Sequence, residues 1–185
     1  MKPRARLKTA VEVSRIRMAG RIVGGIFKEL SGIIAPGITT RDIEVFCRKR
    51  IGEGGAESAL KGFEGYPGYV CISVNQVMVH GVPNDYILAE GDLVKVDVAV
   101  NKGGWYADGA WTFIVGRGSE EGHRLRNAAW AASMAGIAAA RGGNRIGDIG
   151  GAVEEAVVRR GCNIIPHFVG HGIGFDLHEE PSIYP

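Results

Sequence analysis

The chain has 185 residues, of which 45% are hydrophobic, and its formal net charge is +2. This length and composition suit one globular domain with a buried core, and so small a net charge gives no electrostatic preference for nucleic acid or membrane surfaces. No apolar secretory segment follows the basic start of the chain, and no run is long enough to span a bilayer. The three cysteines form no Cys-x-x-Cys pair, so neither a disulfide framework nor a thiolate zinc site is expected. We therefore expect a soluble protein of the reducing intracellular compartment.

Two helices are predicted at the start of the chain. Thr9 and Glu12 have the spacing of a capping box, and apolar residues then recur at helical spacing as far as Leu30. Residues 39–42 have the composition of a second helix start, and that helix should run to about Gly52.

Short extended segments should follow. Residues 58–70 contain three glycines and are expected to form a loop with short extended pieces. Residues 70–74 are predicted to form one strand, and residues 77–80 to form a second strand after a turn.

Residues 91–116 predict a β-hairpin. Valines alternate with other residues from Val94 to Val100, residues 101–104 supply turn-forming Asn and Gly, and a returning strand begins at Trp105. A loop at Lys102-Gly103 pairs each valine with an apolar residue or a glycine and sets Asp97 directly opposite Asp108. A loop at Gly103-Gly104 instead makes the two aspartates diagonal neighbours on the same face.

Two carboxylates this close repel each other unless something compensates. A shared proton or a cation would do so, and a hard divalent cation suits paired carboxylates. The alternative is that Asp97 and Asp108 lie on a solvated face without function. Because strands are depleted in aspartate and both residues fall in apolar runs, the pair is a candidate metal site.

A weak internal repeat follows the hairpin. A third helix is predicted from Ser119 to about Arg141, and residues 143–149 then resemble residues 37–43 at a constant offset of 106. Each segment leads into a helix that ends in a basic pair and a glycine, so we predict an α+β fold with two related halves. The second half's counterpart of the aspartate hairpin would begin near position 197, so we expect the sequence to be cut short.

Histidines cluster near the end of the sequence. His167, His171 and His178 lie within twelve residues, but Pro166 and the neighbouring glycines argue against a helical zinc motif. Glycines on both sides of His171 allow its backbone to come close to a ligand or another element.

Several segments together resemble type I methionine aminopeptidases in order and spacing, over nearly the whole chain: LKTAVEVSRIRMAGRI, GFEGYPGYVCISVNQVMVHGVP, GDLVKVDVAV, residues 105–116 and GHGIGFDLHEEP. The resemblance implies the α+β pita-bread (creatinase/aminopeptidase) fold with two pseudo-symmetric halves. Residues 1–185 would form one catalytic domain, with a first half to about residue 118 and an incomplete second half at about 119–185.

The resemblance also implies a function. It indicates a cytoplasmic, monomeric metalloprotease that removes the N-terminal methionine of nascent peptides, with two divalent metal ions (Co, Mn, Fe, Zn or Ni). A contact with the ribosome is left open, and no nucleic acid or membrane partner is expected. By position, Asp97, Asp108 and His171 match the family's metal ligands, Asp108 being the bridging one. His80 and His178 match its catalytic, substrate-contacting histidines.

The family's methionine pocket is matched by Phe63, Tyr66, Cys71 and Leu177, although Leu177 replaces an aromatic residue often found there. Cys71 can equally be a small buried hydrophobe without chemistry. The Ala-Asp-Gly sequence around Asp108 departs from the family's usual Gly-Asp-Thr but keeps the ligand.

The family's two remaining glutamate ligands would lie beyond Pro185. Two cations would then share two aspartates and a histidine, so we expect the 185-residue chain to be weakly active or inactive. An Xaa-Pro peptidase of the same fold is a second candidate enzyme class, although those enzymes usually carry an additional N-terminal domain. The alternative from another class is a non-catalytic module that binds peptides or ribosomes.

Overall fold

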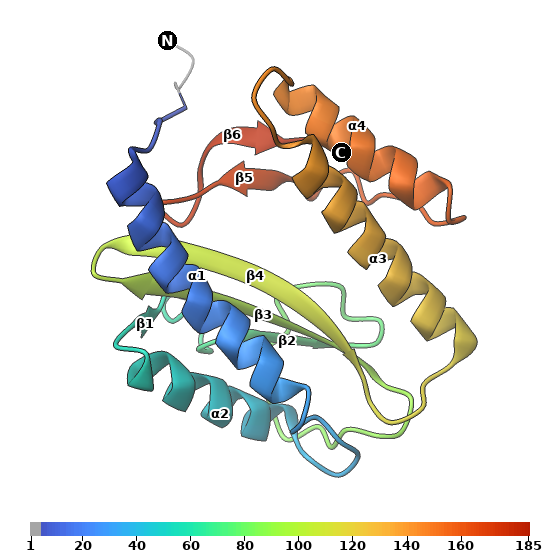
Figure 1. Ribbon diagram of the computed structural model, residues 1–185. Coiled ribbons are helices and arrows are strands. Elements are labelled where there is room, and N and C mark those ends of the chain that lie inside the picture. Colours follow the sequence, from blue (N-terminus) through green and yellow to red (C-terminus); the bar gives the residue numbers. More distant parts are fainter. Residues whose placement is uncertain (1–4) are drawn as a thin grey trace. The chain divides into compact units, whose positions relative to one another are not determined.

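The computed structural model describes residues 5–185 and divides into two compact units. The first unit comprises residues 7–119 together with residues 173–177. The second comprises residues 120–172 and 178–185, together with Ala5 and Arg6 at the start of the described chain. Figure 1 labels the helices and strands of both units. Within residues 5–185, no helix is both long enough and apolar enough to cross a bilayer.

The first unit begins with two capped helices. Helix α1 (Ala10–Leu30) starts after Thr9, whose side chain accepts a hydrogen bond from the Glu12 amide while the Glu12 carboxylate accepts one from the Thr9 amide at 2.7 Å. Helix α2 (Thr40–Glu53) starts with the same arrangement between Thr39 and Asp42. Each capping box satisfies two backbone donors that a helix start leaves unpaired. Both predicted helices are confirmed.

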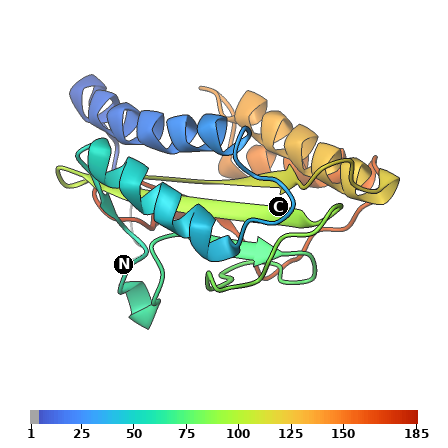
Figure 2. The same ribbon diagram turned by 90° about the horizontal axis from the view of Figure 1, so that it is seen from below.

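A four-stranded antiparallel sheet is the second layer of this unit. Strand β3 (Leu93–Lys102) lies at its centre, with β4 (Trp105–Ile114) on one side and both β1 (Glu57–Ser58) and β2 (Cys71–Val74) on the other. A short 3-10 helix, η1 (Phe63–Gly65), interrupts the connection between β1 and β2. Figure 2 shows α1 running along one side of this sheet, and residues of α1 and α2 belong to the same core cluster as the valines of β3.

The core lies between the two helices and the sheet. The four valines of β3 are fully buried, and they meet the buried faces of α1 and α2 in one cluster, which includes Ala19, Val23, Ile26, Leu30, Ile43, Cys47 and Ile51. Complete burial of an aliphatic side chain of this size contributes roughly 1.5–3 kcal/mol. Burial of the valines therefore determines which face of β3 points into the core, and the residues between the valines lie on the opposite face.

The register of the hairpin corrects the first of the two predicted pairings. The structure pairs Lys102 with Trp105, so the loop is Gly103-Gly104 and not Lys102-Gly103. Both loop glycines have positive φ, at 59° and 81°. A two-residue hairpin turn of this kind matches the twist of the strands but is unfavourable for a side chain such as that of lysine. Asp97 therefore lies opposite Ala110 and not opposite Asp108.

The predicted strand at residues 77–80 is wrong. These residues form an irregular loop in which Val77, Met78 and Val79 are 48%, 53% and 42% exposed. Positive φ values at Asn75 (49°) and His80 (57°) turn the backbone away from the sheet at both ends of the segment. Strand propensity is overridden because no neighbouring strand pairs with this segment.

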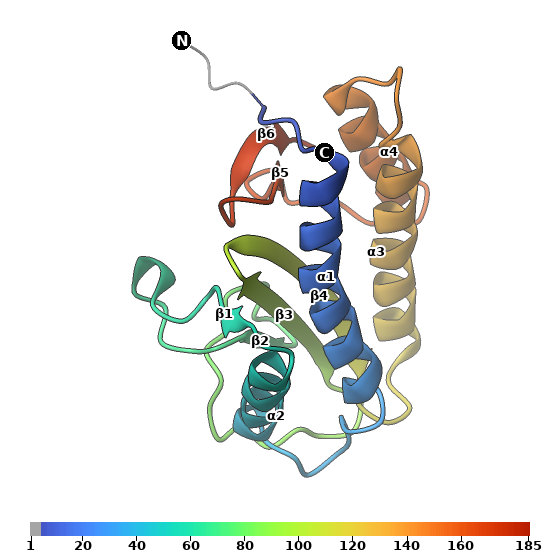
Figure 3. The same ribbon diagram turned by 60° about the vertical axis from the view of Figure 1, so that its left-hand side comes forward.

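The second unit contains a helix pair and a small hairpin. Helices α3 (Glu120–Ala139) and α4 (Ile146–Val158) pack closely where Gly136 meets Val153, since a Cβ at that glycine would lie 2.8 Å from the valine. Strands β5 (Gly170–Gly172) and β6 (Glu179–Ile183) pair antiparallel. Figure 3 shows these four elements from a second direction. The absence of a helix around His167 and His171 agrees with the prediction.

The two units repeat one local motif. Gly37 and Gly143 have φ values of 96° and 95°. Two residues later the backbone amides of Thr39 and Arg145 donate to the side chains of Asp42 and Asp148, at 2.8 and 2.7 Å. In both units a longer helix precedes the motif and a shorter helix follows it. The predicted offset of 106 residues is thus matched in backbone conformation and in hydrogen bonding.

Candidate functional site

Asp97 and Asp108 lie on the same face of the hairpin, opposite the apolar core. Asp97 pairs with Ala110, two residues beyond Asp108, so the two carboxylates are diagonal neighbours across β3 and β4. Such neighbours in a regular ladder are about 7–8 Å apart between Cα atoms, within reach of one shared ion. Asp97 is half-buried and Asp108 is exposed. This is the second of the two arrangements considered from the sequence.

Cys71 and Tyr66 border Asp97. Cys71 is the register partner of Asp97 on β2 and is 3% exposed. Burial, together with the negative charge of Asp97, raises the pKa of the Cys71 thiol despite an opposing hydrogen bond from Tyr66. Burial and the hydrogen bond to Cys71 likewise raise the pKa of Tyr66. A raised pKa favours the protonated thiol, which is compatible both with a residue that lines an apolar pocket and with a small buried hydrophobe.

His80 ends the loop that follows β2. Its side chain is exposed and its φ of 57° lies in the left-handed region, which non-glycine residues seldom adopt. The next residue, Gly81, is held against β2, because the Ile72 amide donates to its carbonyl at 2.8 Å. The C-terminal end of the loop that carries His80 is thus attached to β2.

The second unit holds two histidines side by side. The rings of His171 and His178 are 4.4 Å apart between centroids and meet edge to face. Nδ1 of His171 lies 2.9 Å from the carbonyl oxygen of Gly172. A carbonyl only accepts, so Nδ1 is the donor in this contact, and Nε2 is the nitrogen through which the ring would coordinate a metal ion. His167 lines the same hollow of about 550 Å³ as these two residues.

Residues 173–177 connect these histidines and pack within the first unit. The Tyr106 amide donates to the Gly174 carbonyl at 2.9 Å, and the rings of Trp105 and Phe175 are 4.2 Å apart. Leu177, one of the residues assigned to the methionine pocket, is buried there. Phe63, another of them, is 39% exposed on η1.

The predicted site residues thus form two sets. Asp97 and Asp108 share one sheet face in the first unit, and His171 and His178 are paired in the second. Among the described residues 5–185, no three His, Cys, Asp or Glu side chains come together in a metal-binding group.

A family model for "Metallopeptidase family M24" matches residues 14–185. The chain belongs to this family. Membership implies a divalent metal cofactor, although it does not identify the ion.

Among its relatives is methionine aminopeptidase 1 of Bacillus subtilis, which is 35% identical over 176 residues, covering 95% of this chain and 71% of the relative. The solved methionine aminopeptidase of Thermotoga maritima is 36% identical with a TM-score of 0.94, and that of Rickettsia prowazekii is 31% identical with a TM-score of 0.95. Each alignment covers 98% of this chain and 73% of the solved chain. This M24 chain therefore has the α+β pita-bread fold predicted from its sequence.

Three residues beside the site were not singled out from the sequence of this M24 chain. Asn75, Asp92 and Lys95 form a hydrogen-bonded group where the loop carrying His80 leaves β2. From the sequence, Asn75 lies only in the predicted turn between residues 70–74 and 77–80. Its tolerance of positive φ was the available signal, but its partners lie 17–20 residues further along the chain.

Proposed function

We propose that this chain is a metal-dependent aminopeptidase that removes the N-terminal methionine of nascent polypeptides in the cytoplasm, acting as a monomer. The observation that carries the proposal is the placement of Asp97 and Asp108 on one sheet face in a member of family M24. Its relatives from B. subtilis and T. maritima bear the name methionine aminopeptidase. A contact with the ribosome is a secondary part of the proposal, tested separately by cosedimentation.

Asp97, Asp108 and His171 would hold the metal, with Asp108 shared between two ions. Carboxylate oxygens and a neutral imidazole nitrogen suit the divalent ions Co, Mn, Fe, Zn and Ni. The same-face aspartates and the protonated Nδ1 of His171 fit this role. When bound, such ions supply an activated water and polarise a carbonyl group. The chain's own contribution is to hold two carboxylates together in a position where they would otherwise repel each other.

The peptide would be held by the remaining residues. His80 would orient the peptide nitrogen, and a donor nitrogen of His178 would stabilise the negative charge that develops on the carbonyl oxygen. The methionine side chain would lie among Phe63, Tyr66 and Leu177, with the neutral thiol of Cys71 as part of the apolar lining.

A polypeptide of these 185 residues would have little or no activity. It supplies two aspartates and His171 to two cations, which is too few protein donors for a tightly held pair. The chain spans about 70% of the relatives' length. Cleavage of Met-Ala-Ser by the purified polypeptide at ordinary aminopeptidase rates would contradict this part of the proposal.

Metal binding tests the site itself. Titration of the metal-free polypeptide with Mn²⁺, followed by calorimetry, should show binding that Asp108→Ala or Asp97→Ala weakens by at least tenfold, or about 1.4 kcal/mol. Glu57→Ala is the matched control, because Glu57 is an exposed carboxylate on β1 of the same sheet. Equal Mn²⁺ affinity in the Asp108 and Glu57 variants would refute the assigned ligands.

The competing function is a non-catalytic module that binds peptides. A wild-type polypeptide that binds Met-Ala-Ser but takes up no Mn²⁺ would support the module and exclude the metal-dependent enzyme for this polypeptide.

A further inference from the structure

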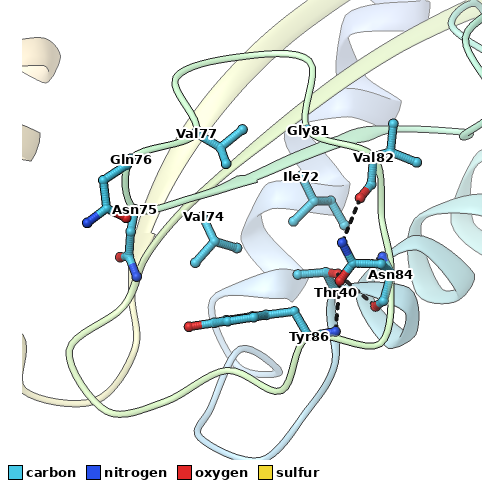
Figure 4. Close-up of a pocket in the computed structure, with 10 residues that line it drawn as sticks. All are labelled: Thr40, Ile72, Val74, Asn75, Gln76, Val77, Gly81, Val82, Asn84 and Tyr86. Atoms are coloured by element: carbon cyan, nitrogen blue, oxygen red, sulfur yellow. Dashed lines mark hydrogen bonds between the residues drawn. The ribbon is translucent and has the colours of Figure 1, made fainter.

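Residues 75–81, here called the 75–81 loop, carry His80 and border a cavity. A cavity of about 520 Å³ is lined by this loop, by Ile72 and Val74 of β2 and by Tyr86. Figure 4 shows the loop passing from Asn75 at one side of the cavity to Gly81 at the other. Val77, Met78 and Val79, in the middle of the loop, are 42–53% exposed, so the attachments of the loop at its two ends matter for its position.

The Asn75 end is attached through every polar group of that residue. The backbone N–H of Asn75 donates to the Leu93 carbonyl at 2.9 Å, and the side-chain Oδ1 of Asn75 accepts from the backbone N–H of Leu93 at 2.9 Å. Its Nδ2 donates to Asp92 at 2.8 Å, and its carbonyl accepts from Nζ of Lys95 at 2.6 Å. These bonds hold the residue at its unfavourable φ of 49°.

The Gly81 end is attached to β2. Its amide donates to Oγ of buried Ser73 at 3.0 Å, and its carbonyl accepts from the Ile72 amide and from the Tyr66 hydroxyl, both at 2.8 Å. A Cβ at Gly81 would lie 2.3 Å from the Ile72 carbonyl oxygen, so only glycine fits this approach. His80 directly precedes this anchored residue, at positive φ.

Lys95 is the part of this attachment that carries a charge. Its ammonium group is half-buried on the polar face of β3, and it is the donor to the Asn75 carbonyl. A charge-assisted hydrogen bond is stronger than the neutral bonds beside it, and its loss would leave a partly buried carbonyl without that donor.

We propose that Lys95 and Asn75 form a clamp that fixes the 75–81 loop and thereby positions His80 for the peptide substrate. Lys95 acts through the loop and is a positioning residue. The inference rests on the proposed function, which assigns His80 to substrate contact. The clamp itself is independent of that assignment, because it predicts the backbone conformation of His80.

The first test is the backbone of His80 in Lys95→Met, which keeps most of the apolar stem and removes the donor. Scalar couplings measured by NMR report φ at His80, and we expect them to shift toward averaged values in this variant and to be restored in Lys95→Arg. Lys102→Met is the matched control. Lys102 lies on the same strand and its Nζ donates to the Gly54 carbonyl at 2.5 Å, far from the loop.

The second test is a double-mutant cycle on Met-Ala-Ser binding, measured by calorimetry. Lys95→Met and His80→Ala should each raise the dissociation constant about tenfold, which is a loss of about 1.4 kcal/mol in binding free energy. The double variant should bind no more weakly than His80→Ala alone, because an unpositioned residue and a missing residue are equivalent.

Three outcomes would overturn part of the argument. Unchanged His80 couplings in Lys95→Met would refute the clamp. Additive losses in the double variant would show that Lys95 acts on binding through its charge or through general stability, and would refute the positioning role. A wild-type polypeptide that does not bind Met-Ala-Ser would refute the proposed function and the positioning role, and the couplings would then decide the clamp alone.

Discussion

Replacement of Asp92 by asparagine is expected to destabilise the first unit strongly. Asp92 is 7% exposed and lies immediately before β3. Its Oδ1 accepts from Nδ2 of Asn75 at 2.8 Å, and its Oδ2 accepts from the Ala89 amide at 2.9 Å and from the Tyr86 hydroxyl at 3.1 Å. Three donors thus converge on one carboxylate and tie together three segments of the chain.

An amide cannot satisfy these donors, because it presents one oxygen where the carboxylate presents two. At least one donor would face the new NH₂ group, and the remaining bonds would lose their ionic strengthening. An unsatisfied buried donor costs about 1–3 kcal/mol, so Asp92→Asn should lower the free energy of unfolding by about 2–4 kcal/mol at pH 7. For a chain of this size, this corresponds to a fall of roughly 5–15 °C in the melting temperature.

The effect should depend on pH. Burial alone would raise the pKa of Asp92, but the hydrogen bonds from Ala89, Asn75 and Tyr86 outweigh it and hold the pKa below its ordinary value of 3.8. A depressed pKa stabilises the folded state above the unfolded-state pKa, and the stabilisation is lost as the pH falls through the folded-state pKa. The difference between wild type and Asp92→Asn should therefore be constant above about pH 5 and shrink in more acidic solution.

Urea unfolding followed by circular dichroism, from pH 7 down to pH 3, measures this difference. Asp85→Asn is the control, because Asp85 is also paired, with Arg41 at 2.6 Å, but its side chain is 79% exposed. That variant should change the free energy of unfolding little, since exposed ion pairs are screened by solvent. A loss for Asp92→Asn no larger than that for Asp85→Asn, or one that does not change with pH, would refute the reasoning.

Three further outcomes are expected. Gly81→Ala should lower the free energy of unfolding by about 2–3 kcal/mol, because its Cβ would press on the Ile72 carbonyl. Gly24 lies on α1, where a Cβ would enter open space, so Gly24→Ala should be neutral or should stabilise the fold by up to about 1 kcal/mol. In the hairpin loop, Gly104→Ala should cost about 1–2 kcal/mol at its φ of 81°, whereas Gly103→Asn should be tolerated. Addition of EDTA to the Mn²⁺-loaded polypeptide should lower its melting temperature, because a ligand that binds only the folded state stabilises it. Thermal denaturation measures all three, and equal effects within either glycine pair, or no response to EDTA, would contradict them.

The parts of the fold that depend on local contacts were predictable from the sequence. The capping boxes at Thr9 and Thr39 involve residues three positions apart, and the buried valines of β3 follow a strict alternation. The same-face placement of Asp97 and Asp108 also follows from the hairpin alone, because both candidate registers keep them on one face.

The errors came from choices that local pattern leaves open. Both hairpin registers set apolar residues against apolar residues or glycine, so hydrophobicity could not separate them. The turn could have done so, since only Gly103-Gly104 tolerates positive φ at both positions without cost. The loop from Val77 to Val79 has strand-forming residues, but its conformation is set by Asn75 and by the partners of Asn75, which lie 17–20 residues further along, just before β3 and on it. No pattern within the loop reports those contacts.

The local motif that is repeated at Gly37 and Gly143, where a helix begins, has a consequence for how the polypeptide folds. Both copies of the motif depend only on contacts between neighbouring residues, such as the hydrogen bonds of Asp42 and Asp148 with the backbone amides three positions earlier. Short loops close at small entropic cost, so both helix starts can nucleate early and independently of each other. The pairing of β2 with β3 joins residues about twenty positions or more apart and must come later. During synthesis, the first helix pair can therefore take shape before its sheet has left the ribosome.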